Sequence, residues 1–227
     1  MPSLGSETDD VQYSIPEDGF IYAEDAALGQ RVSTMRGTPY ASVDGFAFFK
    51  QNIMDDSNIM SALKSCLHCE SMGLGLYRTL GPVPGAYSFR RSNPDLPVES
   101  VVVHLLDKET EIVLWKASHR AKVPFFKGKI GLWQATSSEL EGAGLQCVKK
   151  TFENGGYCIR DTRVFMEVLN GRAITFAIAK EDVVKKWEPM ELDESLNQQW
   201  RKFKRQRFRS TQNTATHRGR ERKNKTD

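Results

Sequence analysis

Residues 155–179 read Gly-Gly-Tyr-Cys-Ile-Arg-Asp-Thr-Arg-Val-Phe-Met-Glu-Val-Leu-Asn-Gly-Arg-Ala-Ile-Thr-Phe-Ala-Ile-Ala, and this stretch decides the fold class. Three short apolar segments follow one another, separated by an Asp-Thr-Arg corner and by Asn170-Gly171. Asn-Gly between apolar segments is typical of a β-hairpin, because both central residues of a type I′ turn need a positive φ. The stretch predicts the end of an antiparallel β-barrel or β-sandwich, with a hairpin at residues 170–171.

The rest of the chain adds further strands and two helical regions. Strand-like runs at 100–106 and 111–116, separated by a charged turn, predict a second hairpin, and 87–89 and 145–151 are further strand candidates. The aromatic cluster at 43–50 favours a strand or a core-facing arm. Asp55-Asp-Ser-Asn58 offers N-caps for a helix from about 59 to 72, which Gly73 and Gly75 would end. Residues 181–209 show a helical pattern that predicts a long C-terminal helix.

Length and composition indicate one sizeable domain with tails. The chain has 227 residues, and 39% of them are hydrophobic. We expect a disordered lead-in at 1–18, a single domain at 19–200 and a basic, mostly disordered tail at 201–227. No apolar run approaches the ~20 residues that span a bilayer. The first residues are polar and acidic, so we expect an intracellular protein, cytoplasmic or nuclear and not secreted, with no membrane partner. Its four cysteines are then free thiols.

The net charge of +3 hides an asymmetry between the body and the tail. Residues 201–227 hold eleven Lys and Arg against two acids, so the remaining 200 residues carry a net charge of −6. Runs of Lys and Arg bind polyanions through counterion release or serve as nuclear import signals. This predicts, as an alternative function, a nuclear or nucleic-acid-associated protein whose tail contacts a polyanion or an import receptor. The basic residues of its first cluster are Arg201, Lys202, Lys204, Arg205, Arg207 and Arg209.

Two segments resemble a known enzyme family. Residues 101–120 contain two strand-like runs joined by a short charged turn and close on Ser118-His119-Arg120. This segment, together with residues 155–179, resembles the phytanoyl-CoA hydroxylase-like group of iron- and 2-oxoglutarate-dependent dioxygenases. The resemblance covers roughly residues 85–180. It implies a mainly β fold with flanking helices, namely a double-stranded β-helix of the jelly-roll or cupin-like type.

The family's iron ligands are missing at the matching positions. Members hold iron with His-x-Asp on an early strand and with a distal His, which together form a facial triad. Counted from Asp161, the distal position falls on Met166, and a thioether is a poor ligand for oxygen-activating Fe(II). The early His-x-Asp would lie shortly before Val101, and residues 87–95 there contain no His. Arg172 matches the family's clamp for the 2-oxoglutarate carboxylate.

The resemblance therefore implies a dioxygenase-like barrel without catalytic iron or another cofactor. Such a barrel would bind a small organic ligand, either as a non-oxidative enzyme of natural-product biosynthesis or as a binding or assembly protein. The ligand-binding residues it implies around the mouth and interior are Arg90, His104, Met166 and Arg172. A further alternative is an active oxygenase, with Fe(II) and 2-oxoglutarate, whose atypical ligands are His104, Asp107 and His119. Against it, a spacing of three puts His104 and Asp107 on opposite faces of a strand.

Cys66-Leu-His-Cys69 matches a C-x-x-C pattern. A structural zinc site needs four ligands, and Cys147 and Cys158 are isolated from one another. The motif also lies well inside a predicted helix, whereas redox motifs of this type begin one. The pattern therefore indicates semi-buried helix cysteines.

Overall fold

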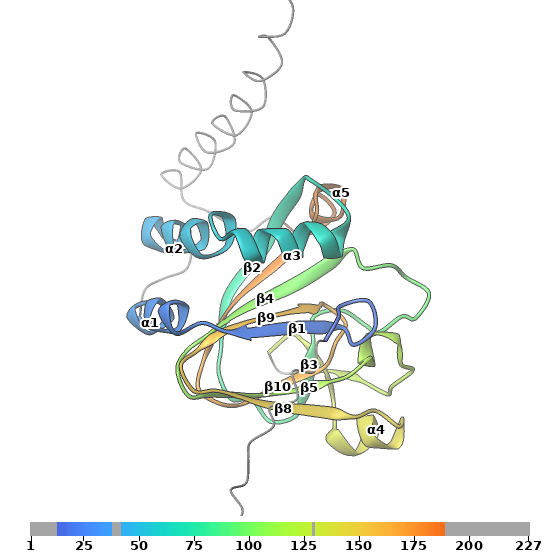
Figure 1. Ribbon diagram of the computed structural model, residues 1–227. Coiled ribbons are helices and arrows are strands. Elements are labelled where there is room, and N and C mark those ends of the chain that lie inside the picture. The colour runs from blue at the N-terminus through green and yellow to red at the C-terminus, as the bar shows by residue number, and fades with distance from the viewer. Residues whose placement is uncertain (1–12, 38–41, 129, 189–227) are drawn as a thin grey trace, which may run out of the picture.

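Two antiparallel β-sheets face one another in this protein (Figure 1). The computed structural model describes residues 13–37, 42–128 and 130–188. The first sheet contains, in spatial order, β1 (Phe20–Glu24), β9 (Gly156–Asp161), β4 (Ser100–Leu106), β11 (Ala173–Lys180) and β2 (Met72–Leu80). The second contains β6 (Phe126–Lys127), β7 (Trp133–Ala135), β3 (Ala86–Ser88), β10 (Met166–Asn170), β5 (Thr110–Trp115) and β8 (Cys147–Phe152).

The chain alternates between the two sheets as it advances. β2 and β4 belong to the first sheet, whereas β3 and β5 belong to the second. The later run repeats this alternation, since β9 and β11 lie in the first sheet and β8 and β10 in the second. Two interleaved runs that alternate in this way form a double-stranded β-helix, so the predicted mainly β fold is confirmed.

Both predicted hairpins are wrong, because the strands on either side of each turn lie in different sheets. β4 pairs with β9 and β11, and β5 pairs with β8 and β10. Likewise β10 and β11 do not pair with each other. At the second turn Gly171 has φ 82°, but Asn170 is not among the residues with positive φ, so this is not a type I′ turn. Each connection crosses from one sheet to the other.

Helices cover the outer face of the first sheet (Figure 1). They are α1 (Ala26–Thr34), α2 (Val43–Phe49), the π-helical segment η1 (Lys50–Met54) and α3 (Ser57–Leu67). Because successive strand residues point to opposite faces, one set of strand side chains packs against these helices and the other set fills the barrel. On β4, Val101, Val103 and Leu105 belong to the helix-side core, whereas Leu106 belongs to the core between the sheets.

Shorter helical segments complete the described chain: η2 (Ser118–Arg120), α4 (Ser137–Gly142) and α5 (Glu181–Val184). Residues 13–18 of the predicted lead-in form a turn, in which the backbone N–H of Asp18 donates to the carbonyl of Ser14. The helix predicted from residue 181 to 209 begins as α5 but ends at Val184, because residues 185–187 form a turn and a bend. The rest of that prediction and the basic tail lie beyond residue 188, outside the described residues. No helix in the described ranges has the length and apolarity needed to cross a membrane.

The aromatic cluster at 43–50 is helical, which corrects the expectation of a strand. Ser42 caps α2 by accepting a hydrogen bond from the backbone N–H of Gly45. The buried side chains of Phe48 and Phe49 then face the first sheet, where the Phe49 and Phe176 rings lie 5.1 Å apart. The local cap and helical packing against a sheet outweigh the strand preference of the aromatic residues.

The helix predicted from 59 to 72 ends earlier, and the strand that follows it was not predicted. His68 closes α3 in the left-handed conformation, and Gly73 and Gly75 lie inside β2. The reason for glycine is contact with the segment after β11. A Cβ at Gly73 would lie 3.1 Å from Val184 Cγ1, and one at Gly75 would lie 2.0 Å from Trp187 Cε3. The glycines let the chain beyond β11 lie flat on this strand.

We expect Gly75→Val to displace the Trp187 indole from β2 and to lower the free energy of unfolding by about 1–3 kcal/mol, the usual effect of overpacking. Trp187 should become more exposed to water, and a red-shifted tryptophan emission would report this. Gly81→Ala is the matched control, since the nearest atom to a Cβ there is 3.9 Å away. An unchanged emission spectrum in the valine variant would contradict the docking.

Candidate functional site at the barrel mouth

An open pocket of about 440 Å³ lies at one end of the barrel. Its residues come from the loop after β3, the loop before β6, and β7. They combine cationic, aromatic and amide side chains: Phe89, Arg90, Arg91, Ser92, Asn93, Leu96, Phe125 and Trp133. We call this the mouth pocket. Its volume falls within the range of roughly 300–1,000 Å³ that is typical of small-molecule sites.

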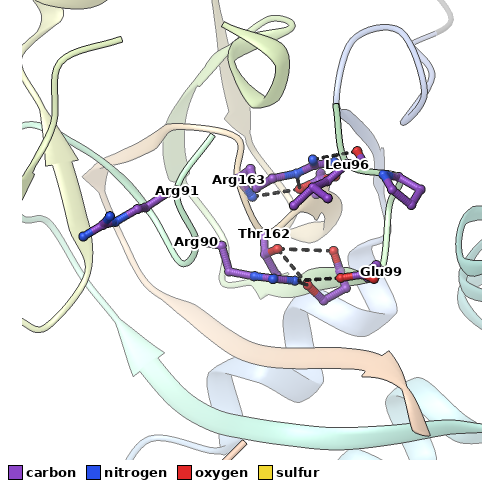
Figure 2. A pocket seen from close by; sticks show the side chains of 9 residues that line it. Arg90, Arg91, Leu96, Glu99, Thr162 and Arg163 are labelled. Atoms are coloured by element: carbon purple, nitrogen blue, oxygen red, sulfur yellow. Dashed lines mark hydrogen bonds and ion pairs between the residues drawn. The ribbon is translucent and has the colours of Figure 1, made fainter. Parts of the chain in front are cut away.

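The two arginines of the mouth pocket are held in different ways. Arg90 makes long contacts with the Glu99 carboxylate at 3.4 Å and with the Ser100 hydroxyl at 3.5 Å. Arg91 lies over aromatic rings, with its Cζ 4.3 Å from the Trp133 ring centre and 5.7 Å from that of Phe125. Figure 2 shows the Arg91 side chain pointing away from Arg90. No carboxylate in the described ranges pairs with Arg91, so its donors are free for a ligand.

A buried ion pair anchors the loop that forms one wall. Asp161 accepts hydrogen bonds from Arg163 Nε at 2.9 Å and from Nη2 at 2.7 Å. Arg163 Nη1 in turn donates to the carbonyls of Asn93 and Leu96, at 2.7 and 2.8 Å. Figure 2 shows Arg163 reaching toward Leu96. Both charged side chains are at most 7% exposed, so this loop is tied to the barrel by well-made buried contacts.

Behind the pocket, a polar cluster lies in the interior of the barrel. Its members are fully buried: Arg160 on β9, His104 on β4, Thr175 on β11 and Tyr87 on β3. Arg160 Nε donates to His104 Nε2 at 2.9 Å, and His104 Nδ1 lies 2.9 Å from the Thr175 hydroxyl. Because Nε2 accepts from a guanidinium, the neutral imidazole carries its proton on Nδ1 and donates it to Thr175. We call these residues the interior cluster.

Two groups of the interior cluster have no hydrogen-bond partner in the described part of the chain: Arg160 Nη2 and the Tyr87 hydroxyl. They belong to one neighbourhood, since Arg160 Cζ lies 5.7 Å from the Tyr87 ring centre. It also lies 5.3 Å from the ring centre of Phe89, which lines the mouth pocket. Phe89 is thus the side chain between the pocket and the buried guanidinium.

The neutral state of two buried histidines makes stability depend on pH. Burial lowers the pKa of His104 well below its ordinary value of 6.5, and the charge of Arg160 lowers it further. Burial also lowers the pKa of His119. Below about pH 6.5 the unfolded chain binds protons that the native chain does not, so the free energy of unfolding falls by up to about 1.4 kcal/mol per pH unit for each histidine. Denaturant unfolding between pH 7.5 and 5 measures this.

His104→Gln is the matched variant, because its amide oxygen keeps an acceptor for Arg160 Nε and its side chain does not titrate. The slope of stability against pH should be shallower in this variant, with the His119 share retained. An equal slope in both proteins would show that His104 is protonated in the folded state.

Solved structures of other proteins share this fold. No protein-family model and no curated protein matches the sequence. HygX from Streptomyces hygroscopicus, solved with nickel and 2-oxoglutarate, has a TM-score of 0.50 at 10% identity over 79% of this chain and 94% of its own. The epimerase SnoN, in complex with Fe3+, alpha ketoglutarate and nogalamycin RO, has 0.50 at 10% over 79% and 89%. EctD from S. alaskensis, with 2-oxoglutarate and 5-hydroxyectoine, has 0.51 at 13% over 82% and 86%.

This chain shares the double-stranded β-helix fold of these proteins. Identities of 10–13% extend the likeness to the fold and no further.

The described residues do not offer the ligand set that the resemblance expects for iron. Met166, at the distal ligand position implied by the resemblance, is buried and paired across the sheet with Tyr87 and Leu114. A thioether and a phenol are poor substitutes for imidazole and carboxylate ligands of Fe(II). The described residues contain no group of three His, Cys, Asp or Glu side chains able to hold a metal. The Arg160 guanidinium near Tyr87 would also repel a second cation there.

The alternative triad of His104, Asp107 and His119 is not assembled. His104 belongs to the interior cluster, whereas Asp107 follows β4 and pairs with Arg172 and Arg36. His119 lies in η2 and packs against Gly19. A Cβ on Gly19 would lie 2.6 Å from the Nδ1 of His119. The C-x-x-C cysteines are free and partly buried: Cys66 lies in α3, and Cys69 follows its end.

The structure brings together three of the four predicted ligand residues. Arg90 lines the mouth pocket, and His104 and Met166 point into the barrel behind it. Arg172 lies at the opposite end, where its Nη2 donates to the carbonyl of Val32 at 2.6 Å and to Asp107 at 3.2 Å. The seven residues of β4 separate the two ends by about 20 Å. Arg172 therefore closes the far end of the barrel and anchors α1.

Sequence reasoning missed Arg160, Tyr87 and the aromatic residues of the pocket. One signal was available, because Arg160 follows the apolar run Tyr157–Ile159 and shares a strand face with Cys158. A charged residue on the inner face of a buried strand points to a polar interior. Phe125 and Trp133 carried no signal, since they reach the pocket from distant parts of the sequence.

Proposed function

We propose that this protein binds a small organic ligand in the mouth pocket and does so without a catalytic iron. The observation that carries the proposal is the pocket itself, in which an arginine without a carboxylate partner lies over two aromatic rings. Aromatic walls bury the apolar body of a ligand, and the guanidinium orients its polar group. Such a site suits a binding protein or a non-oxidative enzyme of small-molecule biosynthesis.

The metal-free part of the proposal rests on the interior cluster. The resemblance puts Met166 at the position of the distal imidazole. Met166 pairs across the sheet with Tyr87, whose ring lies 5.7 Å from the Arg160 guanidinium carbon. A barrel of this kind can still orient a substrate and stabilise developing negative charge with preorganised donors. Arg160 and His104 are the side chains available for that task, and both are held by buried hydrogen bonds.

Anaerobic titration with Fe(II) and 2-oxoglutarate tests the metal-free reading. We expect no charge-transfer band at one equivalent of iron, in a protein whose circular dichroism shows that it is folded. A stoichiometric band would make this an oxygenase and overturn the proposal. Ligand binding is tested separately through Trp133: aromatic carboxylates and their amides should quench its fluorescence, and Trp133→Phe should remove the response. A panel that leaves the emission unchanged contradicts a ligand in the mouth pocket.

A second candidate function rests on the charge of the tail, which lies outside the described residues. The net charge of +9 on residues 201–227 favours contact with nucleic acid or an import receptor. Salt-sensitive binding to a DNA duplex that is lost when 201–227 are deleted would support it. Binding that survives the deletion would assign the contact to the barrel instead.

A further inference from the structure

Among the described residues, no carboxylate faces Arg160, which is a buried cation. Its side chain is fully buried, and its hydrogen bonds go to neutral acceptors, His104 Nε2 and the carbonyl oxygen of Val164. A buried charge without a counter-ion costs several kcal/mol, so native proteins rarely leave one unpaired. The barrel interior is therefore electropositive at this point.

The nearest carboxylates are engaged elsewhere. Asp161 is the next residue on β9, so its side chain points to the opposite face of the strand, where Arg163 occupies both of its oxygens. Glu167 lies on β10, next in the chain to Met166, and it accepts hydrogen bonds from Trp115 Nε1 and Ser137. The other titratable groups near the guanidinium are the Tyr87 hydroxyl and the Cys158 thiol, both uncharged because burial raises their pKa.

We propose that Arg160 and Tyr87 form an anion site inside the barrel, which takes the carboxylate of a small organic acid whose remaining atoms lie in the mouth pocket. The two unused groups are Arg160 Nη2 and the Tyr87 hydroxyl. Each donates a hydrogen bond, and a carboxylate has two oxygens to accept them. The anion supplies the counter-charge that the described residues around Arg160 do not.

Phe89 sets the route to this site. Its ring lines the mouth pocket and lies 5.3 Å from Arg160 Cζ, so rotation of one partly buried side chain connects the two. This site deepens the proposed function, because it names the ligand class as small organic acids. It can nevertheless be tested apart from the pocket, because formate is small enough to need no aromatic wall.

The experiment exchanges sodium chloride for sodium formate at constant ionic strength and follows thermal unfolding. At ten times the dissociation constant, formate should raise Tm by about 3 °C. Formamide, which matches formate in size without its charge, should give no rise. The rise should disappear in Arg160→Met and weaken about tenfold in apparent affinity in Tyr87→Phe. Arg36→Met, an exposed arginine at the other end of the barrel, is the control and should keep the full rise.

Each result tests the anion site, the mouth-pocket function or both. Equal Tm in chloride and formate, or a rise that persists in Arg160→Met, overturns the anion site. If Arg160→Met does not fold, Tyr87→Phe decides, and unchanged formate protection in that variant overturns the proposal. Formate protection without quenching of Trp133 by aromatic acids leaves the anion site standing and removes the pocket function. Equal quenching by acids and amides, without formate protection, overturns the anion site and leaves the mouth pocket as the ligand site.

Discussion

Replacing Gly155 by alanine is expected to lower the free energy of unfolding by about 3 kcal/mol or more, because strain and overpacking act together there. Gly155 has φ +86°, and a Cβ on it would lie 2.5 Å from Gly29 Cα and 2.8 Å from the carbonyl oxygen of Leu106. Both obstacles are backbone atoms, one in α1 and one at the end of β4, so neither can rotate away. The substitution must separate α1 from the barrel or distort the turn into β9.

Gly144→Ala is the matched control for the backbone conformation. Gly144 has φ +76°, and nothing lies within 4 Å of its Cβ position. Its replacement should cost about 1 kcal/mol, the penalty of the left-handed conformation alone. Urea unfolding of both variants measures the difference. Equal losses would show that α1 adapts to the extra carbon and that the close approach at Gly155 has no energetic weight.

Asp161→Ala is expected to cost about 3–5 kcal/mol, because it leaves a buried guanidinium without its partner. Asp161 accepts three hydrogen bonds from Arg163, from its backbone N–H, Nε and Nη2. The freed Arg163 should also release the loop that it holds through the carbonyls of Asn93 and Leu96. A marginally stable domain has about 5–15 kcal/mol in total, so the loss is a large part of it.

The loop readout separates this prediction from a general loss of stability. In conditions where Asp161→Ala is still folded, proteolysis between residues 91 and 97 should become faster, since the loop loses its anchor. Glu99→Ala is the control, because Glu99 pairs with Arg90 at a half-exposed site and its removal should cost at most about 1 kcal/mol. A similar small effect for both variants would mean that the buried pair contributes no more than a surface one.

The strands themselves could be read from the sequence, but their partners could not. The run at 100–106 is a strand in the structure with the same bounds, because three consecutive valines favour a strand there. The turns at 107–110 and 170–171 look like hairpins locally, since a short polar link between two apolar runs serves either connection. Whether the chain turns back beside itself or crosses to the facing sheet depends on contacts with strands far away in the sequence.

The glycines of β2 illustrate the same limit. Gly73 and Gly75 read as helix terminators, because glycine weakens a strand and ends a helix. Their reason is the Trp187 and Val184 side chains, which pack on them from more than a hundred residues away. No local rule contains that contact.

The sequence by itself determined the fold class and the position of most strands, because these depend on residue type and short-range periodicity. It also placed Arg90 near the mouth and His104 and Met166 in the barrel. Only the tertiary structure shows that Arg172 lies at the far end of the barrel and that Arg160 donates a hydrogen bond to His104. The reason is that the crossovers set which strands are neighbours. The charge of the interior is a sum over strands from distant parts of the chain, so only the assembled barrel shows that the Arg160 guanidinium has no carboxylate partner among the described residues.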